Sequence, residues 1–312
     1  MQKVTGQTVL DYLRPRLFDP LGIEHPTWAA NSQGISLGGY GLSIRTEDIA
    51  RFGQLYLQKG AWQGKQLIPT AWVEAATARQ MSNGSNPASD WDQGYGFQFW
   101  RSRHGSYRGD GAFGQYCLVM PDQDAVIAIT SGLKDMQAVL NLLWEKILPA
   151  LQPRGLPRNK DMQQQLSHKL ASLLIPPAKG SSSSATAEKA SGRKFVFPLN
   201  DQKLESLTVD VGNQSSGTTL HLLYDGREQI VRCGQGEWKK GRLQLPGFPE
   251  RAVAASGAWI SDDSYTAKLC FYETPYVLTL KMRFTDGQVF FDRDSNVAFG
   301  PSKPAQLTGR VE

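Results

Sequence analysis

The spacing of apolar residues predicts that the first half of the chain mixes helices with strands. Between residues 8 and 17 apolar positions recur every three or four residues, as on one face of a helix. Residues 45–60 repeat this pattern, with acidic residues in the first turn and Gly60 after the last, which predicts a helix with ordinary ends. A further helix is predicted over 69–78, with Pro69 at its start.

From residue 94 the pattern changes to that of strands. The runs "GYGFQFW" (94–100), "GQYCLVMP" (114–121) and "DAVIAITSG" (124–132) are short and apolar, with turn residues between them. They predict adjacent antiparallel strands, the last two joined by a tight "PDQD" connection. Residues 134–151 predict a strongly amphipathic helix, capped by Asp135, that covers one face of this sheet.

The second half of the chain is predicted to form a separate all-β domain. Period-two alternation dominates residues 194–312, where Asp225-Gly226 and Asp286-Gly287 mark hairpin turns. The stretch "PPAKGSSSSATAEKASGRK" before it has no aromatic residue and little to bury, as in a flexible linker. We therefore expect one domain over 1–150, a helical connector and flexible linker over 151–193, and an all-β accessory domain over 194–312.

Composition narrows the classes of partner. Among 312 residues, 40% are hydrophobic and 20% charged, which is ordinary for a soluble globular protein. The net charge of +5 is scattered, without a basic stripe, so we do not expect a nucleic-acid partner. No apolar run has the length of a transmembrane segment, and the first 22 residues lack the pattern of a signal peptide. The localisation of the protein stays open.

The cysteines and histidines give no sign of a metal centre. Cys117, Cys233 and Cys270 lie far apart, each in an apolar run, and are expected to be buried free thiols. The histidines have no metal-ligand spacing. We therefore expect neither a metal nor an organic cofactor.

Four consecutive pieces of residues 1–150 resemble one enzyme family. They are "QKVTGQTVLDYLRPRLFDPLGIEHPTW", "GGYGLSIRTEDIARFGQLYLQKGAWQGKQLIP", "GYGFQFW" and "GDGAFGQYCLVMPDQDAVIAITSG". Together they resemble the β-lactamase-related serine hydrolases, which include penicillin-binding proteins, class C β-lactamases, related esterases and nylon-oligomer hydrolases. The resemblance implies an α+β fold: an incomplete β-lactamase-like domain, with a helical subdomain and an antiparallel sheet against a C-terminal helix. The β-rich part resembles the C-terminal extensions of some of these hydrolases, as a lipocalin-like barrel or sandwich.

The resemblance also implies one wall of an active site. Relatives carry Lys/His-Thr/Ser-Gly at a glycine turn, and a backbone N–H on the strand that follows helps to bind the oxyanion. Aligning the last glycine with Gly111 makes Ala112 the oxyanion donor and assigns substrate binding to Gly109, Asp110, Gly111 and Gln115. Glycine would let a substrate approach the backbone closely. The cationic residue of the motif is absent here, and a surface or hairpin role for Gln115 stays open.

The nucleophile of the family has no counterpart in the chain. It should be Ser-x-x-Lys at the start of a helix, with a Tyr-x-Asn or Tyr-x-Ser motif, and relatives carry both upstream of the helix that opens this chain. Ser131 and Ser191 have a lysine at the right spacing, but neither begins a suitable helix. Ser36 fits Gly-x-Ser-x-Gly without the strand and helix that this motif requires. We expect that an upstream segment is missing, through truncation, gene splitting or a misplaced start at Met1.

The resemblance therefore implies the C-terminal portion of a bacterial serine hydrolase that acts on an amide or ester bond through an acyl-enzyme. The intact parent would take a small-molecule or peptide-like substrate, and relatives are often exported. The chain by itself should be inactive. The alternative is a non-catalytic pseudoenzyme whose β-domain binds a cell-wall component or a small apolar ligand. For that alternative, a set of aromatic residues would line a cavity rather than fill the core: Trp238, Trp259, Tyr265, Phe271 and Tyr272.

Overall fold

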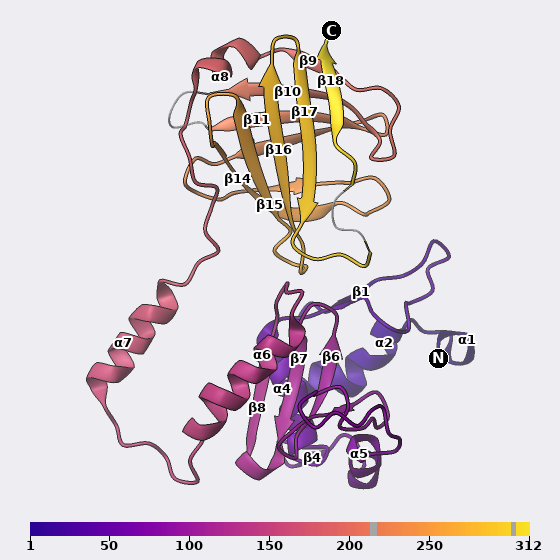
Figure 1. The fold of residues 1–312 in the computed structure, drawn as a ribbon. Coiled ribbons are helices and arrows are strands. Elements are labelled where there is room, and N and C mark those ends of the chain that lie inside the picture. Colours follow the sequence, from indigo (N-terminus) through magenta and orange to yellow (C-terminus); the bar gives the residue numbers. More distant parts are fainter. Residues whose placement is uncertain (213–216, 301–303) are drawn as a thin grey trace. The chain divides into compact units, whose positions relative to one another are not determined.

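The computed structural model describes residues 1–212, 217–300 and 304–312, which form two compact units. The first unit is Met1–Pro157 and the second is Arg158–Glu312 (Figure 1). Each unit has hydrophobic clusters of its own, so each buries apolar surface without the other.

A four-stranded antiparallel sheet forms the centre of the first unit. Its strands lie in the order β5 (Trp100–Arg101), β6 (Tyr107–Gly111), β7 (Gln115–Met120) and β8 (Ala125–Ile129). The β7–β8 connection is the tight hairpin that the sequence predicts. The β6–β7 turn is residues 112–114, where Phe113 and Gly114 have φ of 68° and 89°.

The strand predicted over 94–100 is wrong in extent, because only Trp100 of that run lies in β5. Gln98 has a φ of 64°, which breaks an extended run. The Phe97 N–H donates to the Ala76 carbonyl, 2.8 Å away, at the end of α5 (Thr70–Thr77). A hydrogen bond to a helix end therefore replaces the expected strand pairing.

Helices cover both faces of this sheet (Figure 1). On one face, α4 (Thr46–Leu57) brings Tyr56 against Val119 of β7. On the other, α6 (Met136–Leu142) brings Leu140 against Leu118. Alternate residues of β7 thus pack against different helices, which explains why its run is continuously apolar. The Asp135 carboxylate accepts the Ala138 N–H, so the predicted cap of α6 is confirmed.

The remaining helices and hairpins of the first unit are short. At the start of the chain, Phe18 and Leu21 pack against Leu55 of α4, and the Thr8 hydroxyl caps the helix that follows it. The elements are α1 (Gln2–Thr5), α2 (Val9–Leu13), η1 (Arg14–Phe18), α3 (Asp19–Leu21), β1 (Thr27–Trp28), β2 (Leu42–Ser43), β3 (Ala61–Trp62), β4 (Lys65–Gln66), η2 (Pro121–Gln123), η3 (Leu143–Ile147) and η4 (Leu148–Ala150).

The second unit is a nearly closed barrel of ten antiparallel strands. Of the two architectures that the sequence left open, a barrel or a sandwich, the structure has the barrel. The strands are β9 (Lys194–Val196), β10 (Leu204–Val211), β11 (Thr218–Tyr224), β12 (Arg227–Cys233), β13 (Lys239–Leu243), β14 (Arg251–Trp259), β15 (Ser264–Cys270), β16 (Val277–Thr285), β17 (Gln288–Ser295) and β18 (Leu307–Val311). β18 pairs with both β17 and β9, which joins the two ends of the domain sequence. The edge strands of this sheet are β12 and β13. Gly234, just after β12, bridges to Ser256 of β14, and the Gln244 N–H, just after β13, donates to Gln229 Oε1 of β12 over 2.8 Å.

The segment that the sequence presents as a flexible linker has residues to bury. Helix α8 (Ala185–Ala190) places Ala187 and Ala190 in the barrel core. Upstream, Ser181 pairs with Trp259 of β14 through two backbone hydrogen bonds. The small side chains that lowered the apolar content of this stretch are what lets the helix approach the core closely. The expectation of nothing to bury is therefore wrong, while the domain boundaries remain a prediction.

The aromatic set of the β-domain divides between core and surface. Trp259, Tyr265 and Phe271 are buried in the core, and the Trp259 ring lies 5.3 Å from that of Tyr265. Trp238 and Tyr272 lie outside that buried cluster. The prediction of buried free thiols is confirmed for all three cysteines.

Candidate functional site

The predicted oxyanion donor lies where β6 ends. Ala112 follows Gly111, the last residue of the strand, and its carbonyl accepts a hydrogen bond from Gln115 Nε2 over 3.2 Å. Within the described part of the chain, the Ala112 N–H has no hydrogen-bond acceptor. A free backbone N–H at this point is able to bind a developing negative charge.

The two glycines of the site differ in how much the fold requires them. A Cβ on Gly111 would lie 2.9 Å from the Cβ of Gln115, its partner across the hairpin, so a side chain there would force the two strands apart. A Cβ on Gly109 would meet Cys117 at 3.6 Å, an ordinary contact. The hairpin itself therefore requires Gly111 but does not require Gly109, and the role of both glycines in substrate binding stays a prediction.

The Asp110 side chain is committed to an ion pair inside the sheet. Its Oδ2 lies 2.8 Å from Nη2 of Arg108, and both side chains are almost fully buried. Burial raises the pKa of Asp110, although the positive charge and hydrogen bond of Arg108 act in the opposite direction. The Arg108 guanidinium also lies 4.8 Å from the centre of the Trp91 ring. Any part of Asp110 in substrate binding stays a prediction.

Gln115 ties the two hairpins of the sheet together. Its Oε1 accepts the Ser131 N–H over 3.2 Å, and its Nε2 donates to the carbonyls of Ala112 and Ser131. These bonds supply the hairpin role that the sequence left open. They also hold the turn that carries the Ala112 N–H.

Each serine considered as a nucleophile has a local structural partner. Ser131 Oγ donates to the carbonyls of Phe113 and Gly114, at 2.9 and 2.7 Å. Ser36 Oγ accepts the Val9 N–H and lies in a loop, and Ser191 Oγ accepts the Val211 N–H next to the barrel. Ser131 nevertheless lies beside the turn of the predicted oxyanion donor, so it is the serine to test first.

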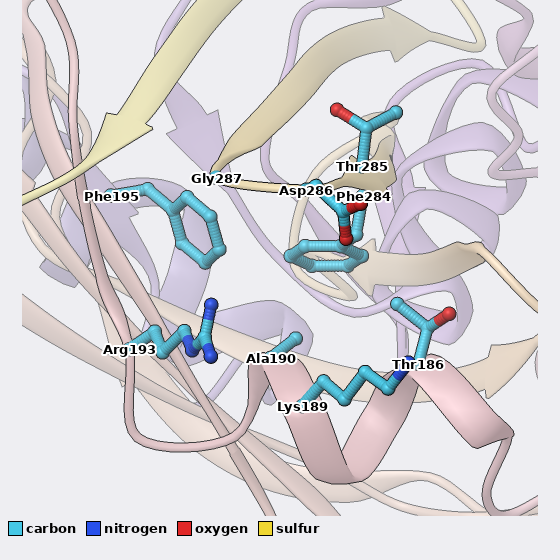
Figure 2. Close-up of a pocket in the computed structure, with 9 residues that line it drawn as sticks. All are labelled: Thr186, Lys189, Ala190, Arg193, Phe195, Phe284, Thr285, Asp286 and Gly287. Atoms are coloured by element: carbon cyan, nitrogen blue, oxygen red, sulfur yellow. The ribbon is translucent and has the colours of Figure 1, made fainter.

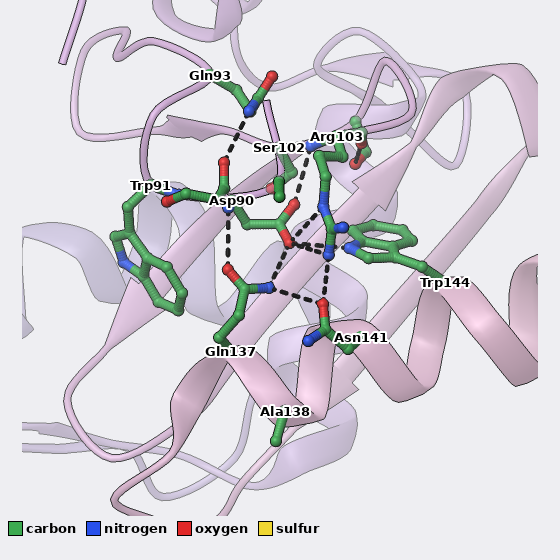
Figure 3. A network of polar contacts seen from close by, with 12 residues as sticks. Asp90, Trp91, Gln93, Ser102, Arg103, Gln137, Ala138, Asn141 and Trp144 are labelled. Atoms are coloured by element: carbon green, nitrogen blue, oxygen red, sulfur yellow. Dashed lines mark hydrogen bonds and ion pairs between the residues drawn. The ribbon is translucent and has the colours of Figure 1, made fainter. Parts of the chain in front are cut away.

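A buried carboxylate that the sequence analysis did not single out joins the β5–β6 connection to α6 and η3 (Figure 3). Asp90 accepts hydrogen bonds from Arg103 N and Nε, Gln137 Nε2 and Trp144 Nε1, all between 2.7 and 3.0 Å. Burial by itself would raise the pKa of Asp90, but these hydrogen bonds outweigh it and the pKa is lowered. The Asp90 carbonyl accepts from Arg108 Nη1 over 2.8 Å, which connects this network to the Arg108–Asp110 pair.

A depression on the second unit lies between α8 and the β16–β17 turn (Figure 2). Its volume is about 380 Å³, and the buried rings of Phe195 and Phe284 form part of its wall. Lys189, Arg193 and Asp286 supply charges at its rim. Another depression, of about 430 Å³, lies on the first unit beside α3, where its lining includes Arg14, Asp19 and His25.

The described residues contain neither a cluster of metal ligands nor a helix able to span a membrane. Within 1–212, 217–300 and 304–312, no three His, Cys, Asp or Glu side chains cluster as metal ligands would. Over the same ranges, no helix has the length and apolar character needed to cross a bilayer.

Comparisons with known proteins show which proteins the chain resembles. Residues 1–152 match the family model described as "Beta-lactamase". The chain is 27% identical over 142 residues to 6-aminohexanoate-dimer hydrolase of Paenarthrobacter ureafaciens, a match that covers 43% of the chain. The chain spans only 36% of that relative's length.

Three solved structures are similar to parts or to nearly all of the chain. A putative 6-aminohexanoate-dimer hydrolase from Bacillus anthracis matches 49% of this chain and 42% of its own at 23% identity, with a TM-score of 0.40. A fatty acid-binding protein of Drosophila melanogaster matches 39% of this chain and 97% of its own at 13% identity, with a TM-score of 0.28. An octameric penicillin-binding protein homologue from Pyrococcus abyssi matches 99% of this chain and 61% of its own at 13% identity, with a TM-score of 0.31.

Proposed function

We propose that residues 1–152, which match the family model described as "Beta-lactamase", belong to the β-lactamase-related serine hydrolases and supply one wall of a serine hydrolase site. The parent enzyme cleaves an amide or ester bond of a small-molecule or peptide-like substrate through an acyl-enzyme. The observation that carries this proposal is the free Ala112 N–H at the end of β6, within the family match.

In this reaction a serine oxygen attacks the substrate carbonyl, whose oxygen becomes an oxyanion. The Ala112 N–H donates to that oxyanion, and one such donor contributes about 2.7–4 kcal/mol to the transition state. Collapse of the tetrahedral intermediate expels the amine or alcohol, which takes a proton, and water then hydrolyses the acyl-serine. The site needs no metal or organic cofactor.

The nucleophile is supplied by a segment that this sequence does not contain. The described serines of the site region are held by backbone groups, and the family's Ser-x-x-Lys helix has no counterpart in the sequence. β8 lies at an edge of the four-stranded sheet, which supports our proposal that the hydrolase domain is incomplete in this chain. The chain alone is therefore inactive.

The experiment compares two proteins on a chromogenic ester and an amide: the chain alone, and the chain extended by the reading frame upstream of the Met1 codon. The proposal expects an in-frame Ser-x-x-Lys in the extension and hydrolysis by the extended protein only. In that protein, Ala112→Pro removes the N–H and should lower kcat by roughly 10²–10³-fold, while Ala112→Ser keeps the N–H and should leave kcat nearly unchanged. Equal kcat values for the two variants would show that the Ala112 N–H does not bind the oxyanion.

A second candidate function, binding without catalysis by a lipocalin-like barrel, rests on the depression beside α8. Its lining has two cations, Lys189 and Arg193, against the single carboxylate of Asp286, and it includes two aromatic rings, which suits a small anion with an apolar body. Titration with 8-anilinonaphthalene-1-sulfonate tests it. Saturable binding that Lys189→Ala with Arg193→Ala abolishes would favour this function, and unchanged binding would count against it.

A further inference from the structure

Helix α7 (Lys160–Ala171) has an apolar face that no residue in the described part of the chain covers. All twelve of its residues are exposed, and it lies near the start of the second unit (Figure 1). Met162, Leu166 and Leu170 follow one another at intervals of four residues, which places them on one side of the helix, and Leu173 comes two residues after the helix ends. We call these four residues the α7 stripe.

The exposure of this stripe is unusual for a soluble surface. Its members are 57–64% exposed, and the apolar run continues at Leu174 and Ile175, which are 70% and 58% exposed. A contiguous group of large exposed apolar residues marks an interaction surface, whereas single ones need no explanation.

The charges around the helix indicate what covers the stripe. Residues 150–180 contain five Lys or Arg residues and a single acidic residue, Asp161. Within the helix, glutamines and Lys169 occupy positions beside or opposite the stripe. A short amphipathic helix with basic flanks is typical of binding in the plane of an anionic membrane surface.

The barrel surface to which the chain attaches after α7 also carries an indole and lysine side chains. The Ile175 carbonyl accepts from Trp238 Nε1 over 2.8 Å, and the Pro176 carbonyl accepts from Lys268 Nζ over 3.2 Å. These bonds fasten the end of the apolar run to the barrel beside Lys239 and Lys240. Indole and lysine side chains are the ones that lie well at a membrane–water interface.

We propose that the α7 stripe binds the surface of an anionic lipid bilayer, with the basic residues around it facing the lipid headgroups. A second copy of the chain fits this surface less well, because pairing two such helices would bring Lys169 and the basic flanks of both copies together. The proposal depends on the second unit and its connector, and it stands whether or not the first unit belongs to a hydrolase.

The test is co-sedimentation of the full chain with vesicles of phosphatidylcholine alone or of phosphatidylcholine with 30% phosphatidylserine. We expect binding to the anionic vesicles that weakens as salt is raised. Leu166→Glu with Leu170→Glu should weaken it by at least about tenfold, since it removes apolar contact and adds negative charge. The matched control, Gln164→Glu with Ala171→Glu, adds the same charge on the opposite face and should retain more of the binding.

Three results would overturn the proposal. If the chain binds neither kind of vesicle, a lipid surface is excluded as the partner. If it binds both kinds equally, the anionic headgroup is excluded as the group that the chain recognises. Equal loss in the stripe variant and in its control would show that the stripe does not enter the bilayer. Sedimentation equilibrium of the same proteins distinguishes the competing occupant: a dimer that the stripe variant dissociates would assign the stripe to a second copy.

Discussion

Gly53 of α4 lies directly against Cys117 of β7. A Cβ on Gly53 would stand 2.9 Å from Cys117 Sγ and 2.5 Å from Cγ1 of Val126 on β8. The absence of a side chain therefore sets how closely α4 approaches the sheet. This contact holds together the face of the first unit that Tyr56 and Val119 also stabilise.

Gly53→Ala should destabilise the first unit. Overpacking costs about 1–3 kcal/mol, and the better helix propensity of alanine offsets up to about 1 kcal/mol of that. Urea unfolding followed by circular dichroism measures the difference. Gly39→Ala is the control, because nothing lies within 4 Å of a Cβ there. Equal stabilities of the two variants would contradict this account of the packing.

Asp90→Asn should lower the free energy of unfolding by about 3–5 kcal/mol near neutral pH, because it leaves Arg103 without its buried partner. The folded pKa of Asp90 lies below its ordinary 3.8, so the wild-type carboxylate stabilises the fold above that value. This contribution is lost as the pH falls through the folded pKa. The difference in the free energy of unfolding between wild type and variant should therefore be largest above about pH 5 and should decrease below pH 3.8.

Thermal unfolding as a function of pH checks this prediction. Asp122→Asn, which changes an exposed carboxylate, is the control and should change stability little at any pH. A gap for Asp90→Asn that stays constant down to pH 2 would show that the charge of Asp90 does not matter.

The buried pair of Arg108 and Asp110 should behave as a unit in a double-mutant cycle. Arg108→Met or Asp110→Asn alone leaves one charge buried without its partner, which costs about 3–5 kcal/mol. The double variant should lose less than the two single losses together, with a coupling of about 0.5–3 kcal/mol. Additive losses in urea unfolding would mean that the ion pair contributes nothing to stability.

Trypsin should cut the connector before it cuts the segment around α8. Arg154 and Arg158 lie in an exposed irregular stretch, whereas Lys189 lies in a helix whose Ala187 and Ala190 are buried in the barrel. Mass spectrometry of the first fragments identifies the cut sites. Ala187→Asp should loosen α8 and open Lys189 and Arg193 to cleavage. Early cutting after Lys189 in the wild type would contradict the packing of α8.

The elements that the sequence predicts best are those whose ends are fixed locally. The Thr8 and Asp135 side chains cap helices through bonds three residues away, and such signals are visible in the sequence. The Asp225-Gly226 turn is equally local, since both residues have positive φ between paired strands.

The features that the sequence does not reveal depend on distant partners. Asp90 receives its hydrogen bonds from residues 13 to 54 positions away, so nothing near it distinguishes it from a surface aspartate. Helix α8 is short and poor in large apolar residues, and only the barrel that surrounds Ala187 makes it part of a core. At the site, the sequence located the hairpin of Ala112 and Gln115, but it did not predict the burial of Asp110 against Arg108.

The most direct test of the central claim is the reaction of this chain with a fluorophosphonate, followed by intact-protein and peptide mass spectrometry. The account predicts no covalent adduct on any serine, because it proposes that the chain carries the oxyanion wall without the nucleophile. An adduct at Ser131 or Ser36 that disappears on substitution of that serine by alanine would contradict it and place the nucleophile within this chain.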